Sequence, residues 1–317
     1  MADKKIIAVM GATGAQGGGL VRAIQSDPSG GFVARAITRD VNSDKAKALK
    51  ALGAEVVSGD IDDEASLKAA FSGAYGVYCV TFFWAHFSPE KEQQGATNMA
   101  RAAKAAGVQH VIWSTLEDTR KLVPLSDNRM PTLQGKYKVP HFDAKGEINH
   151  VFTDLGLPVT FLMASFYWDN MYLFGLGGPA NKDANDTYYV TLPIGSARMA
   201  GIAAEDIGGC AYGIFKKGSE FVGKTVGIAG EHLSGPEMAG KLASGLGIKC
   251  AYNEVSPDAF RAFGFPGAED LGNMFQVYRD FEKEVLGARS VEGSRALNPK
   301  LQSFDQWLAK NKGMLKL

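Results

Sequence analysis

Apolar positions follow two alternating patterns through the first half of the chain. Short apolar runs of strand-forming residues lie at 4–10, 32–38, 54–58, 76–83, 110–115 and 157–163. Segments with helical spacing lie between them, at 16–26, 43–52, 63–71, 89–105 and from 140 onward. Strands separated by helices of this length are typical of a parallel sheet covered on both faces. The pattern predicts an α/β fold of the Rossmann type, with a doubly wound parallel sheet.

Capping residues mark several of the predicted helix ends. Ser43 is a candidate N-cap, and Gly53 stands just past the end of the same helix. Ser88 precedes Pro89, which is favoured at the first helical position, and the long helix that they open should stop at Gly107.

The alternation becomes irregular beyond residue 164. Strands are predicted at 187–192, 225–229 and 249–255, and helices at 204–216, 236–245, 268–285 and 303–311. No linker or internal repeat separates this part from the first. We therefore expect a Rossmann core at 1–163 and a smaller α/β lobe at 164–317 packed on it, with some lobe segments returning to the Rossmann sheet.

Two stretches lack any regular pattern. Residues 117–139 show no periodicity, and residues 165–186 are rich in glycine and aromatic side chains. Loops of that length are usually functional or mobile.

Composition narrows the classes of function. Lysine plus arginine equals aspartate plus glutamate, at 34 each, so the chain has no basic excess for nucleic acid, and no such partner is expected. The cysteines, at 79, 210 and 250, lack metal-ligand or CxxC spacing, which indicates reduced thiols and no metal site. No apolar run suits a signal peptide or a membrane span. We expect a cytoplasmic protein with no membrane contact; a homodimer remains open.

A glycine-rich turn directly follows the first predicted strand. Gly11 permits a tight turn, Gly14 lets the backbone approach a pyrophosphate, and Gly17 lets the next helix pack closely. Amides at that helix start would then meet the phosphates. The predicted dinucleotide contacts here are Gly11, Thr13, Gly14, Ala15, Gln16 and Gly17. The GxxGxxG spacing is that of the short-chain dehydrogenases, and the alternative is a purely structural turn.

The end of the second strand indicates which nicotinamide cofactor binds. NAD sites place an acidic residue there for the ribose hydroxyls, whereas NADP sites offer a cation to the 2′-phosphate. Positions 36–38 hold no acid, and Arg39 can donate two hydrogen bonds to a phosphate. Asp40 should point elsewhere. We predict NADP(H), the alternative being that Arg39 is an ordinary solvated residue.

The ends of the third and fourth strands supply further candidates. Asp60 and Ile61 are placed to flank the adenine, and the chain at Thr81, Phe82 and Phe83 to pass the central phosphates and ribose. The alternatives, equally weighted, are a turn residue at Asp60 and core packing by the two phenylalanines.

Several segments together carry a family resemblance. The segments are GATGAQGG (11–18), Thr-Arg after the second strand, GDIDD (59–63), HFDAKGE (141–147) and LNPKLQSFDQWLAKNKG (297–313). The chain resembles the NmrA-like family, an atypical branch of the short-chain dehydrogenases, and within it the NADP(H)-responsive redox sensors. The resemblance implies a Rossmann domain with a small lobe, dinucleotide binding, and protein interactions without demonstrated turnover.

The catalytic Tyr-x-x-x-Lys pair of active short-chain dehydrogenases is incomplete. Lys145 stands in the expected helix, but His141 occupies the tyrosine position one helical turn earlier. His141 is a candidate acid, although packing at the helix start is the favoured interpretation. Ser114 should hydrogen-bond backbone, and Tyr137 lies in the preceding loop. Tyr212, four residues before a lysine, matches the motif only by chance.

The resemblance also places the segment after the sixth strand beside the nicotinamide ring. It implicates Phe166, Tyr167, Trp168 and Asp169, whereas an aromatic cluster that caps the core is the simple alternative. Many relatives have Arg-Pro just before this segment, where this chain has Met163, Ala164 and Ser165.

Two functions follow from these features. The first is a regulatory protein in which 117–139 and 165–186 order differently with NADPH, so that a protein partner senses the cofactor state. The second is an NADPH-dependent reductase of a planar aromatic, quinone or enone substrate that uses Lys145 without the tyrosine.

Overall fold

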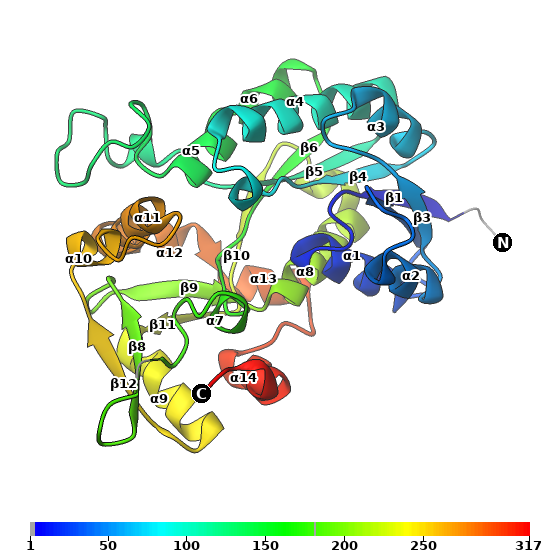
Figure 1. Ribbon diagram of the computed structural model, residues 1–317. Helices are drawn as coiled ribbons and strands as arrows, with labels where there is room; N and C mark the ends of the chain where they lie inside the picture. Colours follow the sequence, from blue (N-terminus) through cyan, green and yellow to red (C-terminus); the bar gives the residue numbers. More distant parts are fainter. Residues whose placement is uncertain (1–3, 181) are drawn as a thin grey trace.

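The computed structural model describes residues 4–180 and 182–317 (Figure 1). Residues 1–3, at the start of the predicted core, and residue 181, in the predicted 165–186 loop, lie outside the described residues. Within these ranges, one sheet has eight strands in the order β13-β10-β6-β5-β4-β1-β2-β3, and its strands pair in parallel. They are β1 (Lys5–Val9), β2 (Phe32–Thr38), β3 (Glu55–Ser58), β4 (Gly76–Cys79), β5 (His110–Thr115), β6 (Val159–Met163), β10 (Thr225–Ile228) and β13 (Arg289–Ser290). The predicted α/β Rossmann fold is confirmed.

Helices cover both faces of this sheet (Figure 1). One face carries α1 (Ala15–Gln25), α2 (Asp44–Ala51), α8 (Ala204–Lys217) and α13 (Val291–Leu297). The other carries α3 (Glu64–Phe71), α4 (Pro89–Ala105) and α6 (Asn149–Asp154), with α5 (Pro140–Glu147) beside α4. Ser43 and Ser88 cap α2 and α4 through their side chains, as predicted.

Two glycines let α1 and α8 pack backbone to backbone. A Cβ on Gly208 would lie 2.0 Å from the amide nitrogen of Leu20, and one on Gly19 would lie 2.5 Å from the carbonyl oxygen of Glu205. Helix α8, β10 and β13 all follow residue 164, yet they pack on or pair with the Rossmann sheet. Segments from the second half of the chain therefore complete the Rossmann sheet and one of its helical layers.

The remaining elements form the smaller lobe. Its strands are β7 (Phe166–Tyr167), β9 (Arg198–Ile202) and β11 (Glu231–Ser234) in one sheet, and β8 (Thr187–Leu192) with β12 (Lys249–Glu254) in another. Its helices are α7 (Asn170–Leu173), α9 (Gly235–Leu246), α10 (Pro257–Arg261), α11 (Ala268–Asp280), α12 (Glu282–Gly287) and α14 (Phe304–Asn311). No helix in the described part of the chain is long and apolar enough to span a membrane.

Two predicted elements end differently in the structure. The strand predicted at 76–83 stops at Cys79, because the chain turns into a short 3-10 helix at Phe83–Ala85. The helix predicted at 268–285 is two helices, α11 and α12, that meet at Phe281, whose φ of −127° is not helical.

Residues 117–139 are anchored at both ends by a single carboxylate. Asp143 on α5 accepts hydrogen bonds at Oδ1 from the Thr119 amide (2.7 Å) and hydroxyl (2.6 Å). Its Oδ2 accepts from the amides of Lys138 (2.8 Å) and Val139 (3.1 Å). Within the segment, Val123 and Met130 join the core of the smaller lobe. In Figure 1 the segment extends beyond the labelled α5, above α11.

Candidate functional site

The strand order places a crevice at the carboxyl end of β1. Strand β1 lies between β4 and β2, and the chain winds in opposite directions from this point. Ligands of open α/β sheets bind at such a switch point, outside the carboxyl ends of the strands. The predicted glycine-rich turn follows β1, and Thr81 follows β4, so both predicted groups meet at this crevice.

The glycine-rich turn has the close backbone packing that its sequence predicts. Gly11 has a φ of +60°, a conformation that favours glycine. A Cβ on Gly17 would lie only 2.5 Å from the Gly11 carbonyl oxygen, so α1 can start directly over the turn only with glycine there.

The start of α1 offers free backbone donors. Gly14 is the N-cap and has no side chain to cap the helix. Among the described residues, none accepts a hydrogen bond from the amides of Ala15, Gln16 or Gly17. An uncapped helix start of this kind suits an anion, because the amides and the positive end of the helix dipole face it together. The turn, with the half-buried Thr13 beside it, fits a diphosphate.

Arg39 lies exposed at the end of β2. Within residues 4–180 and 182–317 it forms no ion pair and no side-chain hydrogen bond. Asp40 is turned away, because its Oδ1 accepts a hydrogen bond from the Asn42 amide (2.8 Å). A cation at this position whose guanidinium is not paired with an acidic side chain of the described residues fits the 2′-phosphate of NADP(H).

The predicted adenine contacts have structural roles of their own. Asp60 makes a turn, since its Oδ1 accepts from the Asp62 amide (3.1 Å). Ile61 packs on Gly95 of α4, where a Cβ would lie 2.8 Å from its Cδ1. Both residues are half-buried, at the end of β3.

The two phenylalanines after β4 differ in exposure. The Phe82 side chain is 62% exposed, whereas Phe83 is buried and packs on Trp84, Phe87 and His141. The alternative of core packing therefore describes Phe83 and does not describe Phe82.

Lys145 is buried and held by three acceptors. Its Nζ lies 2.8 Å from Oε1 of Glu92 and donates to the Thr81 hydroxyl, with the Ser114 carbonyl oxygen at 3.4 Å. The Thr81 hydroxyl in turn donates to Glu92. Glu92 is fully buried on α4, so its carboxylate neutralises the lysine inside the protein.

Glu92 is the residue of this cluster that the sequence analysis missed. It lies in the long helix predicted at 89–105, and no local pattern links it to Lys145. Its Oε2 is buried and accepts no hydrogen bond from the described residues, although Nε2 of His86 lies 3.6 Å away.

His141 is held by a carboxylate from the smaller lobe. Its Nδ1 lies 2.6 Å from Oδ1 of Asp270 on α11, and its ring packs on Trp84 with centroids 4.7 Å apart. A cavity of about 400 Å³ lies beside this pair and is lined by Phe83, Phe87 and Asp270 among others. His141 packs at the start of α5, as favoured, but it also forms an oriented His–Asp pair that the sequence did not reveal.

Gln16 connects the glycine-rich turn to the rest of the site. Its Oε1 accepts hydrogen bonds from the hydroxyls of Tyr78 and Ser114 (the latter at 2.8 Å), and its Nε2 donates to Tyr167. Ser114 was expected to bond backbone, and this expectation is wrong, since its hydroxyl reaches the side chain of Gln16. Burial raises the pKa of Tyr167 to about 12, so the network stays uncharged.

Side chains after β6 point alternately to two sides. Phe166 packs on Phe275, and Trp168 lies against Phe304, both in the core of the smaller lobe. Tyr167, on the other side of the strand, faces Gln16. Only Tyr167 of the three is thus joined to the site.

Asp169 completes a helix end. Its Oδ2 accepts from the Ala204 amide (2.8 Å) at the start of α8, and its Oδ1 accepts from Tyr172 (2.6 Å). The carboxylate therefore caps α8 from outside the helix.

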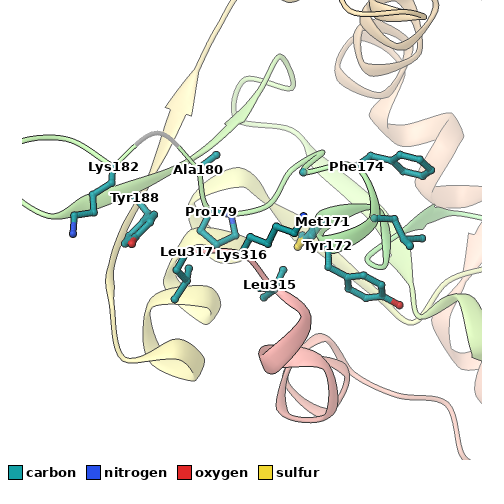
Figure 2. A pocket seen from close by; sticks show the side chains of 12 residues that line it. Met171, Tyr172, Phe174, Pro179, Ala180, Lys182, Tyr188, Leu315, Lys316 and Leu317 are labelled. Carbon is teal, nitrogen blue, oxygen red and sulfur yellow. The ribbon is translucent and has the colours of Figure 1, made fainter.

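Other features lie away from the crevice. Tyr212 and Lys216 both hydrogen-bond to Asp27, which is not a predicted site residue, and this agrees with a chance match to the catalytic motif. Tyr137 is buried between Arg120 and Lys136. A groove on the smaller lobe has a volume of about 650 Å³, and none of its lining residues is a predicted site residue. Figure 2 shows side chains that line it, among them Met171, Tyr188 and Leu315.

Comparison with known proteins matches this arrangement to one family. The model of the NmrA-like family matches residues 3–308. The NmrA-like family domain-containing oxidoreductase FrzB of Cladobotryum sp is 29% identical over 284 residues, 85% of this chain and 82% of the relative. Among solved structures, NmrA, a negative transcriptional regulator in complex with NADP, has a TM-score of 0.77 at 23% identity, covering 97% of this chain and 95% of that one. The Citrobacter sp. triphenylmethane reductase complexed with NADP(H) has a TM-score of 0.72 at 20% identity, covering 97% and 99%.

Proposed function

Because this chain belongs to the NmrA-like family, whose fold it has throughout, we propose that it is an NADP(H)-binding regulatory protein. In this proposal it senses the ratio of NADPH to NADP, and a protein partner responds to the cofactor state. The relative NmrA is itself described as a negative transcriptional regulator and has been solved with NAD and with NADP. The NmrA complexes support a dinucleotide site in this chain. Because they contain both cofactors, the preference for NADP(H) is argued from this chain's own residues.

The cofactor choice rests on Arg39. It is exposed, free of any described ion pair, and lies where a 2′-phosphate would be bound in this fold. The amides at the start of α1 would hold the diphosphate, and Tyr167 with Gln16 would close the crevice on the other side. NADPH would bring a transferable hydride to the crevice. Binding and orienting the cofactor would be the task of the residues named above.

The surroundings of Lys145 are the observation that most supports a regulatory role. The position that holds the proton-donating tyrosine in active relatives is occupied by His141, and the lysine itself is buried against Glu92. Short-chain dehydrogenases use that lysine's charge to lower the pKa of the tyrosine. With no tyrosine and a neutralised charge, this arrangement favours binding over turnover.

Helix α5 offers a physical route from the cofactor to a partner surface. Lys145 reaches the crevice, and Asp143, two residues earlier, holds both ends of 117–139. Gln16 links the glycine-rich turn to Tyr167 at the start of the second predicted loop. Cofactor binding can shift these segments by as much as its affinity differs between their states. Cys79 and Cys210, buried and free, suit the reducing cytoplasm.

The proposal is tested by turnover. We expect NADPH to bind but to be oxidised slowly or not at all with a panel of quinones, dyes and enones, followed by nicotinamide absorbance. Robust oxidation that disappears in both His141→Ala and Lys145→Ala would contradict the regulatory role.

That contradicting result would establish the second candidate, an NADPH-dependent reductase of a planar aromatic, quinone or enone substrate. The favouring observation is the His141–Asp270 pair beside an aromatic-lined cavity of about 400 Å³. A histidine oriented by a carboxylate is a competent proton donor. Curated relatives such as FrzB carry the name oxidoreductase.

A further inference from the structure

Three ionisable side chains form a line from the surface to the crevice. The side chain of His86 is 22% exposed, that of Glu92 is fully buried and that of Lys145 is 10% exposed. Successive members are close, since Nε2 of His86 lies 3.6 Å from Oε2 of Glu92, and Oε1 of Glu92 lies 2.8 Å from Nζ of Lys145. Neither function above uses His86 or gives Glu92 more than a static role.

The ammonium of Lys145 already faces three acceptors. A lysine carries three N–H groups, and the structure gives them Glu92, the Thr81 hydroxyl and, at 3.4 Å, the Ser114 carbonyl oxygen. Lys145 can therefore donate to a cofactor hydroxyl only if it releases part of this set. Turning toward the crevice moves its positive charge away from Glu92.

Glu92 then needs another partner. A buried carboxylate that loses its counter-ion is strongly destabilised. Oε2 of Glu92 accepts no hydrogen bond from the described residues, and the one basic group facing it is His86. Nδ1 of His86 accepts from the Ser88 amide (3.1 Å), so the proton of the neutral ring lies on Nε2, the nitrogen that faces Glu92.

We propose that His86 and Glu92 form a proton-binding site coupled to cofactor binding at Lys145. As Lys145 turns an N–H toward the cofactor, His86 moves onto Oε2 of Glu92 and takes up one proton from solvent at Nδ1, giving up its bond from Ser88. The ring gains one positive charge, which replaces the charge withdrawn from Glu92, and no electron is transferred. The inference rests on the proposed binding of NADP(H), and it adds that one proton is bound at His86 when the cofactor binds.

Other charged side chains of the described residues lie around His86. The Phe83 ring packs on His86 (centroids 6.0 Å apart) and separates it from the His141–Asp270 pair. On the outer side Glu90 accepts a hydrogen bond from the Ser88 hydroxyl and lies 3.8 Å from Lys136. Replacing His86 alone therefore distinguishes proton binding at His86 from proton binding at these neighbouring groups.

The test is calorimetric titration of NADPH in buffers of different ionisation enthalpy, which gives the protons taken up on binding. The wild-type protein should take up a fraction of a proton between about pH 6 and 8, where histidine changes charge. His86→Asn, whose Oδ1 can still accept from Ser88, should lose that uptake. The exposed His150→Asn is the matched control and should behave as wild type. Glu92→Gln, which removes the carboxylate that His86 faces, should lose the uptake as well.

Equal proton uptake by wild type and His86→Asn would overturn the inference, because the proton would then be taken up by a group other than His86. NADPH binding without His86-dependent uptake removes this inference and leaves the proposed function standing. Failure of NADPH to bind the wild-type protein would remove both.

Discussion

At the scale of single residues, His110 shows how burial fixes a protonation state. Its ring is 1% exposed at the start of β5, and Nε2 lies 2.8 Å from the Thr160 hydroxyl. That hydroxyl donates to the Phe221 carbonyl (2.8 Å), so Nε2 must carry the proton. Burial lowers the pKa of His110 to about 4, well below its ordinary value.

A pH dependence of stability follows. The unfolded chain binds a proton at His110 near pH 6.5 and the folded chain only near pH 4, so stability is present above pH 6.5 and falls as the pH drops. Between pH 7 and 5 the contribution is about 2 kcal/mol. His110→Gln, which keeps a donor for Thr160, should lose about this much of the difference in urea-unfolding free energy between the two pH values. The exposed His150→Gln should not, and an unchanged difference in His110→Gln would refute the assignment.

Sequence could identify residues whose role depends on local context, such as the glycines of the turn, and it could place Arg39 directly after β2. It could not identify residues that act across the fold. Asp270 lies 129 residues from His141, and no spacing rule connects them. Glu92 has the pattern of a solvated helix residue, and its burial appears only when α4 and α5 are packed together.

At the scale of elements, the buried parallel strands were predicted best. Strands β2, β5 and β8 have the predicted bounds. Strand β5 is buried along its whole length, and a strand enclosed on both faces is a continuous run of β-forming residues. Strands β7 and β11 were missed, and β7, with two residues, is too short to show a period. Their existence depends on pairing with β9, a contact between distant segments.

The anchoring of 117–139 by Asp143 predicts a local failure when that carboxylate is removed. In Asp143→Asn one oxygen becomes an NH₂ group, which cannot accept from the amides that it faces. We expect a loss of about 3 kcal/mol in unfolding free energy, from charge-assisted bonds and unsatisfied donors, and faster proteolysis within 117–139. Asp127→Asn removes an exposed pair with Arg129 in the same segment and should change stability little. Similar proteolysis in both variants would show that Asp143 does not hold the segment.

At the scale of the whole molecule, buried charge as well as packing ties the last strand of the eight-stranded sheet to the start of the long 117–139 segment. Arg289 on β13 is fully buried and pairs with Glu117, which follows β5. Burial alone would raise the pKa of Glu117, but the charge and hydrogen bonds of Arg289 outweigh it and hold that pKa below its ordinary value. The start of 117–139 is thereby tied to β13, the strand by which the chain returns from the smaller lobe to the Rossmann sheet.

The contacts of α5 and of Gln16 predict which segments should change when the cofactor binds. NADPH should slow hydrogen exchange in 117–139, through Lys145 and Asp143 on α5, and in 165–186, through Gln16 and Tyr167. Helix α14, whose Trp307 packs in the core of the smaller lobe, should change little. Protection confined to the turn at 11–17 would leave NADPH binding intact but would exclude the proposed response of the two segments.

The central claim is that this chain selects NADP(H) through Arg39, and equilibrium titration of NADPH and NADH tests it most directly. Charge-assisted bonds of about 1.5–3 kcal/mol to the 2′-phosphate predict at least about tenfold tighter binding of NADPH. Arg39→Ala should lose most of that preference while NADH affinity stays unchanged. Equal affinity of the wild-type protein for the two cofactors would contradict the account.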